Sequence, residues 1–106
     1  MPGGNESVLL FVNINKGLEE CRRTENALLV DVREAEEYAA GHIPGAVNVP
    51  LSTIESAQLP MDRPLFLYCL RGSRSARAVG ILRRRGYTRI RSIGGINGYK
   101  GERDGR

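Results

Sequence analysis

Short apolar segments alternate along this chain with stretches that have helical composition and spacing. The segments at 26–32 (NALLVDV) and 65–68 (LFLY) are apolar almost throughout, which predicts strands covered on both faces. Further short strands are predicted at 8–13 and 46–49. The alternation of polar and apolar residues at 89–93 predicts a half-exposed strand. The apolar pattern therefore predicts strands along most of the chain, from the first at 8–13 to the last at 89–93.

The segments between these strands favour helices. Helices are predicted at 16–23, 33–42, 51–59 and 75–85, and a glycine follows or closes the second and the last of them. Strands that alternate with helices imply βαβ units, so we predict an α/β fold with a mainly parallel sheet between helical layers. In such folds, ligands bind beyond the carboxyl ends of the strands.

Length and hydropathy restrict the class of protein. At 106 residues the chain is predicted to be a single domain over 1–106, with loose termini at about 1–6 and 101–106. No apolar stretch approaches the ~20 residues of a membrane span, and the first residues lack the features of a secretory signal. We therefore expect a cytoplasmic protein that does not contact membranes, with a monomer as the simplest state.

The charged residues favour an anionic partner. Sixteen Lys and Arg residues outnumber twelve Asp and Glu residues, for a net charge of +4, and fourteen of the sixteen are arginines. The run at 83–85 (RRR) has no interleaved aromatic residues, so it is interpreted as a solvated helix end and no nucleic-acid partner is predicted. With one histidine and no Cys-x-x-Cys pair, no metal or other cofactor is predicted.

The candidate chemistry follows the apolar run at 65–68. Cys69 comes directly after this strand, and a helix is predicted to begin near Ser75. Gly72 allows a tight turn with positive φ, so the backbone N–H groups of 70–75 can converge as an anion-binding nest. A cysteine at that point would be stabilised as its thiolate, which is the nucleophilic form.

Two arginines lie where a helix N-terminus is already positive. Because each charge opposes the helix dipole, Arg71 and Arg74 each destabilise the helix by up to about 1 kcal/mol if nothing is bound. An anion bound in the loop would attract both arginines and make their positions favourable. Taken alone, Cys69 is better interpreted as a core residue, because free cysteine is among the most buried residue types. The combination of strand, cysteine, glycine-bearing loop, two arginines and helix favours a nucleophile instead.

The segment 69–74 (CLRGSR) resembles the active-site loop of rhodanese-homology domains, which are sulfurtransferases. The segment 28–50 (LLVDVREAEEYAAGHIPGAVNVP) looks like the Asp-Val-Arg and Gly-His-Ile-Pro-Gly-Ala signatures of that family, and 94–100 (GGINGYK) resembles its closing pattern, with Tyr99 where many members have Trp. The resemblance implies a rhodanese-like α/β domain with a central, mainly parallel sheet of about five strands and helices on both faces.

The resemblance also implies a sulfur-transfer mechanism. The cysteine would take sulfane sulfur from thiosulfate or a persulfide donor, and the resulting persulfide would pass it to a thiol, small or on a thioredoxin-like protein, or to cyanide. No metal is required, because the donor's sulfur–sulfur bond is already electrophilic. The residues implied are the nucleophile Cys69 and the substrate-binding residues Leu70, Arg71, Gly72, Ser73, Arg74 and Ser75.

Two other functions are weighed against this one. Cysteine-dependent phosphatases and arsenate reductases need five residues between cysteine and arginine, whereas four separate Cys69 from Arg74. In addition, Tyr68 stands where phosphatases usually carry histidine. A sulfur-carrier or protein-binding module of a larger protein remains open, and a carrier would use the same persulfide.

Four other residues of chemical interest are given structural interpretations. Asp31 and Arg33 are expected to form an ion pair that holds the strand end and its neighbouring loops. His42, in GHIPGA, could be a base for Cys69 but is better interpreted as structural. Cys21 lies three residues after Leu18, a spacing that places it on the inner face of the first helix.

Overall fold

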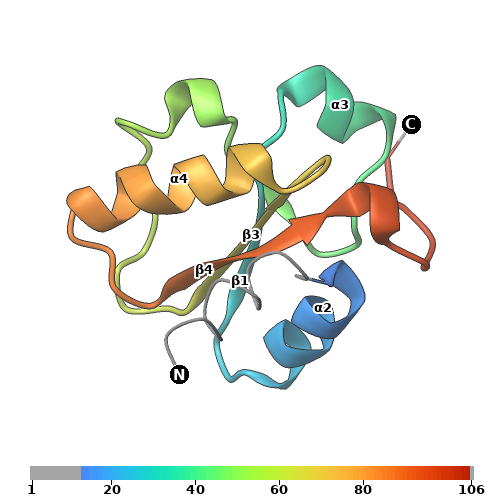
Figure 1. Ribbon diagram of the computed structural model, residues 1–106, viewed down its shortest axis with the longest axis horizontal. Coiled ribbons are helices and arrows are strands. Elements are labelled where there is room, and N and C mark those ends of the chain that lie inside the picture. The colour runs from blue at the N-terminus through green and yellow to red at the C-terminus, as the bar shows by residue number, and fades with distance from the viewer. Residues whose placement is uncertain (1–12, 106) are drawn as a thin grey trace, which may run out of the picture.

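The computed structural model describes residues 13–105, and in this part of the chain helices cover both faces of a parallel sheet (Figure 1). The elements are α2 (Ile14–Arg23), β1 (Leu28–Asp31), α3 (Ala35–Ala40), β2 (Val47–Asn48), the 3₁₀ turn η1 (Leu51–Thr53), β3 (Leu65–Cys69), α4 (Ser73–Arg84), β4 (Ile90–Gly95) and the 3₁₀ turn η2 (Ile96–Gly98). The strand order is β2-β1-β3-β4 and every neighbouring pair is parallel. The predicted α/β fold is confirmed.

The sheet has four strands in the described residues, close to the expected number of about five. The predicted strand at 8–13 lies outside the described residues except for its last member. That residue, Asn13, is the N-cap of α2, and its side-chain oxygen accepts a hydrogen bond from the Asn15 N–H at 2.9 Å. The remaining predicted strands are present with shifted ends.

The central strand β3 is buried at all five residues and separates two apolar clusters. Its residues at 65, 67 and 69 pack with α4 on one face, together with Val30 and Leu82. Phe66 and Tyr68 point to the opposite face and pack with α2. Figure 1 shows these two helices on opposite sides of the sheet. Burial on both faces explains why this segment of the sequence is continuously apolar.

The helix after β3 begins earlier than predicted. It starts at Ser73, two residues before the predicted start, because Gly72 adopts a left-handed conformation with φ of 109° and serves as its N-cap. The expectation of a positive φ at Gly72 is confirmed. The carbonyl of Gly72 accepts the first helical hydrogen bond, from the Ala76 N–H at 3.1 Å. The loop between strand and helix is therefore only three residues long.

The predicted helix at 51–59 is wrong beyond its first turn. Only the 3₁₀ turn Leu51–Thr53 forms. The hydroxyl of Tyr87 accepts from the Leu59 N–H at 3.2 Å and donates to the Leu59 carbonyl at 2.7 Å, so the backbone at that residue bonds to a side chain instead of a helix. Pro60 also disfavours helical geometry at the residue before it.

The C-terminal tail, which was expected to be loose, is attached to the domain in the described residues: Arg103 donates to the Ile96 carbonyl at 3.2 Å, and Tyr99 donates to the Glu102 carbonyl at 3.0 Å. The backbone N–H and carbonyl of Asp104 each pair with His42 at 2.7 Å, which forms an isolated antiparallel bridge. Residues 101–105 are nevertheless exposed. Within 13–105, no helix has the length and apolar character needed to span a membrane.

Candidate active site

The sulfur of Cys69 lies at the carboxyl end of β3, directly beneath the first turn of α4. Its Sγ atom accepts hydrogen bonds from the Gly72 N–H at 3.0 Å and from the Ser75 N–H at 3.3 Å. The residue is only 1% exposed. The short loop therefore wraps the sulfur with backbone donors, which is the arrangement that stabilises negative charge at a helix N-terminus.

A pair of serine hydroxyls adds a side-chain contact to the sulfur. The Ser75 hydroxyl lies 3.6 Å from the Cys69 Sγ and donates to the Gly72 carbonyl at 3.1 Å. It also shares a 2.6 Å hydrogen bond with the hydroxyl of Ser92, which comes from β4. Ser92 was not predicted from the sequence, because its place beside the loop depends on the register of β4 against β3.

A glycine on β4 permits the strand to approach the loop closely. The pairing of β3 with β4 shifts between Leu67 and Cys69, which brings Gly95 opposite the cysteine. A Cβ atom at Gly95 would overlap the carbonyl oxygen of Leu70 and the Cα of Arg71. Gly95, one of the closing glycines of the sequence, therefore has a steric role at the site.

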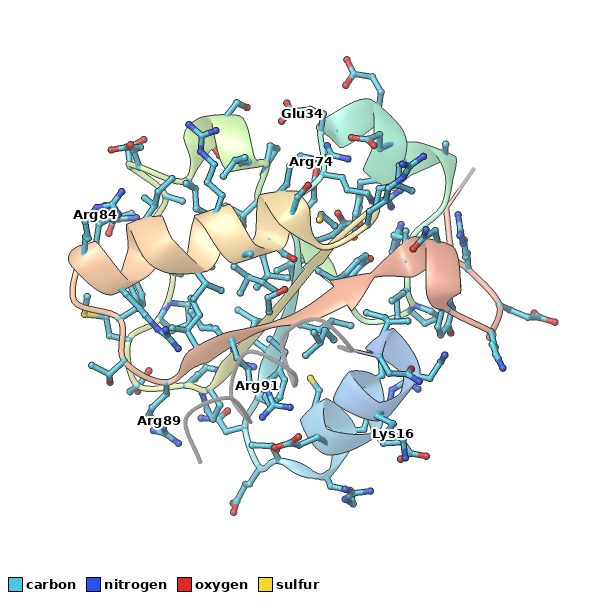
Figure 2. All side chains as sticks on the ribbon, in the orientation of Figure 1. Lys16, Glu34, Arg74, Arg84, Arg89 and Arg91 are labelled. Carbon is cyan, nitrogen blue, oxygen red and sulfur yellow. The ribbon has the colours of Figure 1, made fainter. Side chains whose placement is uncertain are left out.

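The arginine at the start of α4 is paired with a carboxylate from α3. Arg74 donates to Glu37 from NH1 at 2.7 Å and from NH2 at 3.0 Å, and both side chains are about one-third exposed. These hydrogen bonds lower the pKa of Glu37 to about 2. Figure 2 shows Arg74 beside Glu34 at the α3 end of the molecule. The Arg74 guanidinium, which was expected to face a bound anion, thus pairs with Glu37 instead. This contact was not predicted from the sequence.

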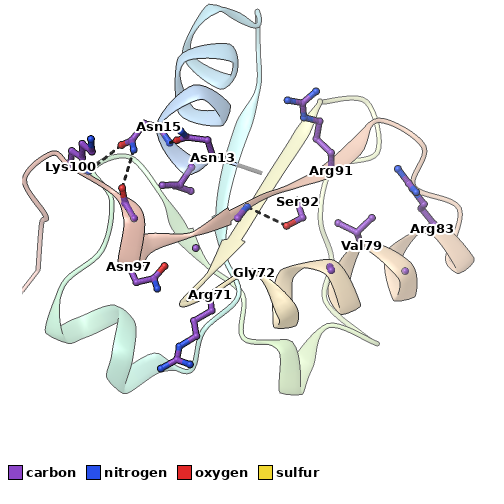
Figure 3. A pocket seen from close by; sticks show the side chains of 16 residues that line it. Asn13, Asn15, Arg71, Gly72, Val79, Arg83, Arg91, Ser92, Asn97 and Lys100 are labelled. Carbon is purple, nitrogen blue, oxygen red and sulfur yellow. Dashed lines mark hydrogen bonds between the residues drawn. The ribbon is translucent and has the colours of Figure 1, made fainter. Parts of the chain in front are cut away.

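Arg71 is exposed and borders a groove of about 870 Å³ that runs beside β4. Gly72, Ser92 and Gly94 line the same end of the groove, and Figure 3 shows the Arg71 side chain extending away from β4. Cys69 does not line the groove, so the groove lies beside the loop 70–75 that surrounds the sulfur and does not cover the sulfur. No pairing of the Arg71 guanidinium is found among the described residues, which leaves its charge available to solutes.

The predicted ion pair at the end of β1 is confirmed. Arg33 donates to the Asp31 carboxylate from NH2 at 2.8 Å, and both residues are buried. Burial lowers the pKa of Arg33, but the hydrogen bond and charge of Asp31 outweigh it and the net shift is upward. A second donor on the same guanidinium nitrogen binds the Gly41 carbonyl at 2.7 Å, which ties the end of α3 to β1.

The structural interpretations of His42 and Cys21 also agree with the structure. The His42 ring stacks on Tyr38 with centroids 3.7 Å apart, and its Nδ1 bonds to the Tyr38 carbonyl at 3.0 Å. Cys21 lies on the buried face of α2, and burial raises the pKa of its thiol, partly offset by Arg22. In the part of the chain that is described, no three His, Cys, Asp or Glu side chains gather as metal ligands.

Comparison with known proteins identifies the family of this chain. A family model described as a rhodanese-like domain matches residues 15–102, which is most of the chain. The chain belongs to the rhodanese-like domain family. The Cys69 loop and the α/β fold of this rhodanese-like domain are thus the features expected from the resemblance of 69–74 and 94–100 to that family.

Individual relatives agree with this assignment. A protein named sulfurtransferase from Allochromatium vinosum is 42% identical over 76 residues, covering 69% of this chain and 71% of the relative. The human thiosulfate:glutathione sulfurtransferase is 39% identical over 85 residues, covering 65% and 74%. The uncharacterized protein YqhL from Bacillus subtilis is 43% identical over 76 residues, covering 70% of this chain, and the match spans only 59% of that relative.

Solved structures agree as well. The structure of the human single-domain sulfurtransferase TSTD1 superimposes with a TM-score of 0.70 at 33% sequence identity, covering 79% of this chain and 89% of that one. The superposition, over most of both chains, agrees with the rhodanese-like fold described above.

Proposed function

We propose that this rhodanese-like domain transfers sulfane sulfur from thiosulfate or a persulfide donor to a thiol acceptor through a persulfide on Cys69. The observation that carries the proposal is the seat of the Cys69 sulfur, which accepts from two backbone N–H groups at 3.0 and 3.3 Å. The names of the Allochromatium and human relatives, both sulfurtransferases, support the same reaction class.

The first half-reaction loads the sulfur. The Cys69 thiolate attacks the outer sulfur of thiosulfate and forms a new sulfur–sulfur bond. The original sulfur–sulfur bond breaks, and its electron pair leaves with sulfite. The cysteine then carries a persulfide whose outer sulfur is anionic, and no proton, metal or redox cofactor takes part in this exchange.

The second half-reaction unloads it. An acceptor thiolate attacks the outer sulfur of the persulfide, the bond to the Cys69 Sγ breaks, and the cysteine leaves as a thiolate. The acceptor becomes the persulfide, so atoms and charge balance over the cycle. Glutathione is one acceptor of this class, since the human relative is named for it.

The loop is suited to the charge that develops in this cycle. The N–H groups of Gly72 and Ser75 already point at the Sγ atom. The next donors, the N–H groups of Ser73 and Arg74 in the first turn of α4, have no acceptor within the helix. We infer that the six residues 70–75 together hold the anionic outer sulfur, because preorganised donors in a water-poor site cost no reorganisation.

The donor is expected to be small and anionic. With 1% of Cys69 exposed, a terminal sulfur atom reaches the nucleophile more readily than a bulky group does. Arg71 is exposed at the loop and supplies long-range attraction for an anion. Arg74 fixes the loop to α3 through Glu37 and contributes positive charge at closer range.

The experiment is the intact mass of the reduced protein after brief exposure to thiosulfate. We expect the mass of one sulfur atom to be added, to be removed by a reducing thiol, and to be absent in Cys69→Ser. The matched control Cys21→Ser should load normally, because Cys21 lies on the buried face of α2. Failure of every sulfane donor to load a free Cys69 would overturn the proposal and favour a binding module.

A further inference from the structure

Three hydrogen-bonded groups connect β4 to the sulfur of Cys69: the Gly94 N–H, the Ser92 hydroxyl and the Ser75 hydroxyl. The Gly94 N–H donates to the Ser92 hydroxyl at 3.4 Å, and the Ser92 and Ser75 hydroxyls are 2.6 Å apart. The Ser75 hydroxyl lies 3.6 Å from the sulfur and 3.1 Å from the Gly72 carbonyl. The only side-chain hydroxyl that contacts the sulfur is thus itself held by a second hydroxyl, within the described part of the chain.

The direction of hydrogen bonding along these groups follows from their chemistry. A backbone N–H can only donate, so the Ser92 oxygen accepts from Gly94 and its own hydrogen can point to Ser75. The Ser75 oxygen then accepts from Ser92, and its single hydrogen is left to choose between the Gly72 carbonyl and the sulfur. This choice is the point at which the pair can respond to the charge on Cys69.

The preferred acceptor of Ser75 differs between the two states of the sulfur. A thiol donates its own hydrogen to the Ser75 oxygen, so the Ser75 hydrogen goes to the Gly72 carbonyl. A thiolate has no hydrogen and is the stronger acceptor, so the Ser75 hydrogen turns to the sulfur. The donation from Ser92 polarises Ser75 and strengthens its bond to the anion.

We propose that Ser92 is a positioning residue that orients the Ser75 hydroxyl toward the Cys69 sulfur whenever the sulfur is anionic. The proposal rests on the proposed function, in which the thiolate is the nucleophile and the leaving group. The serine hydroxyls exchange acceptors only, and neither loses a proton. The thiol proton itself passes to solvent base when the thiolate forms.

The test measures thiolate formation without any sulfur donor. The alkylation rate of Cys69 by iodoacetamide is followed against pH by peptide mass spectrometry, which separates Cys69 from Cys21. Ser92→Ala should move the midpoint of this profile to higher pH and slow alkylation at neutral pH by about twofold to fourfold. Ser92→Thr keeps a hydroxyl on a strand-compatible side chain and should restore the wild-type profile.

A double-mutant cycle separates positioning from general support of the fold. Ser75→Ala should slow neutral-pH alkylation by about tenfold, because it removes the hydroxyl that touches the sulfur. In the Ser75→Ala background, Ser92→Ala should have no further effect, since Ser92 acts through Ser75. Equal effects of Ser92→Ala with and without Ser75 would overturn the proposal, and so would an unchanged profile in Ser92→Ala.

The outcome is distinguishable from failure of the proposed function. Alkylation requires a thiolate but no sulfur transfer, so the shift in Ser92→Ala is readable even if thiosulfate never loads Cys69. Persulfide formation with an unshifted Ser92→Ala profile would sustain the sulfurtransferase proposal and reject the role of Ser92. A shifted Ser92→Ala profile with no loading of Cys69 by any donor would sustain the role of Ser92 and reject the sulfurtransferase proposal.

Discussion

The guanidinium of Arg74 donates two hydrogen bonds to the carboxylate of Glu37, at 2.7 and 3.0 Å, and so joins the first turn of α4 to α3. A cation at a helix N-terminus opposes the helix dipole unless negative charge is near. Glu37 supplies that charge in the folded chain, without a bound anion. The pair therefore anchors the loop that carries Cys69, and its consequences can be measured.

Acid should remove a specific part of the stability through Glu37. Arg74 lowers the pKa of Glu37 to about 2 in the folded protein. Because the folded pKa is the lower one, the contribution is fully present above the unfolded value of ~4.3 and is lost as the pH falls toward about 2. In urea unfolding, the free energy of unfolding of the wild type should exceed that of Glu37→Gln at neutral pH, and the difference should shrink at about pH 3.

The control for this prediction is Glu36→Gln. Glu36 lies on the same helix and is exposed, and no ion pair to it is found among the described residues. Its substitution should change the free energy of unfolding by less than about 0.5 kcal/mol. An advantage over Glu37→Gln that stays constant from neutral to acidic pH would contradict the assigned pairing.

Substitution of Gly95 should damage both the fold and the site. An alanine methyl at this position collides with backbone atoms of Leu70 and Arg71, so β4 or the loop must move. Overpacking of this kind costs about 1–3 kcal/mol. We expect thermal unfolding of Gly95→Ala at lower temperature and slower persulfide formation.

The matched control for Gly95→Ala is Gly80→Ala. Gly80 lies inside α4, and a Cβ atom there meets no neighbour within 4 Å. Alanine in a helix interior is favoured over glycine by about 1 kcal/mol, so this variant should be more stable than the wild type. Equal effects of the two substitutions would mean that the close approach at Gly95 is not the cause.

The buried ion pair at β1 should matter far more than an exposed pair on the surface. Asp31→Ala leaves the buried Arg33 charge without its partner, and such a loss costs about 3–5 kcal/mol. Glu20→Ala removes an exposed partner of Arg91 and should cost less than about 1 kcal/mol. Urea denaturation of both variants checks the prediction, and a Glu20→Ala loss as large as that of Asp31→Ala would refute it.

Arg71 should act on the capture of an anionic donor and not on the chemistry that follows. Arg71→Ala should raise the KM for thiosulfate about fivefold, as expected for loss of one solvent-screened charge worth ~1 kcal/mol, with little change in kcat. The difference should shrink at high salt. Arg77→Ala, an exposed arginine of α4, is the control and should leave KM near the wild-type value.

The local parts of the site were predictable from the sequence. The place of Cys69 at a strand end follows from the apolar run before it. The left-handed turn at Gly72 follows from the need to redirect the chain into a helix. The ion pair of Asp31 and Arg33 was also anticipated, because the resemblance to the rhodanese family implied a structural role for both residues.

The parts that the sequence did not reveal come from distant segments. Glu37 and Ser92 reach the loop from α3 and β4, and their placement depends on how these elements pack. The missing helix after Thr53 depends in the same way on the distant Tyr87 hydroxyl, which bonds to the backbone of Leu59. Propensity and spacing carry no record of such tertiary contacts.

Cys69 ends β3, which pairs with the later strand β4, so the accessibility of its thiol depends on whether β4 has folded onto β3. During synthesis the cysteine is made before β4, yet Ser92 and Gly95 are both supplied by that strand. A growing chain that ends before β4 therefore lacks the strand that packs against the Cys69 loop. A bulky maleimide should label Cys69 in stalled nascent chains and fail to label it once the last strand has docked, so that thiol accessibility reports the moment of completion.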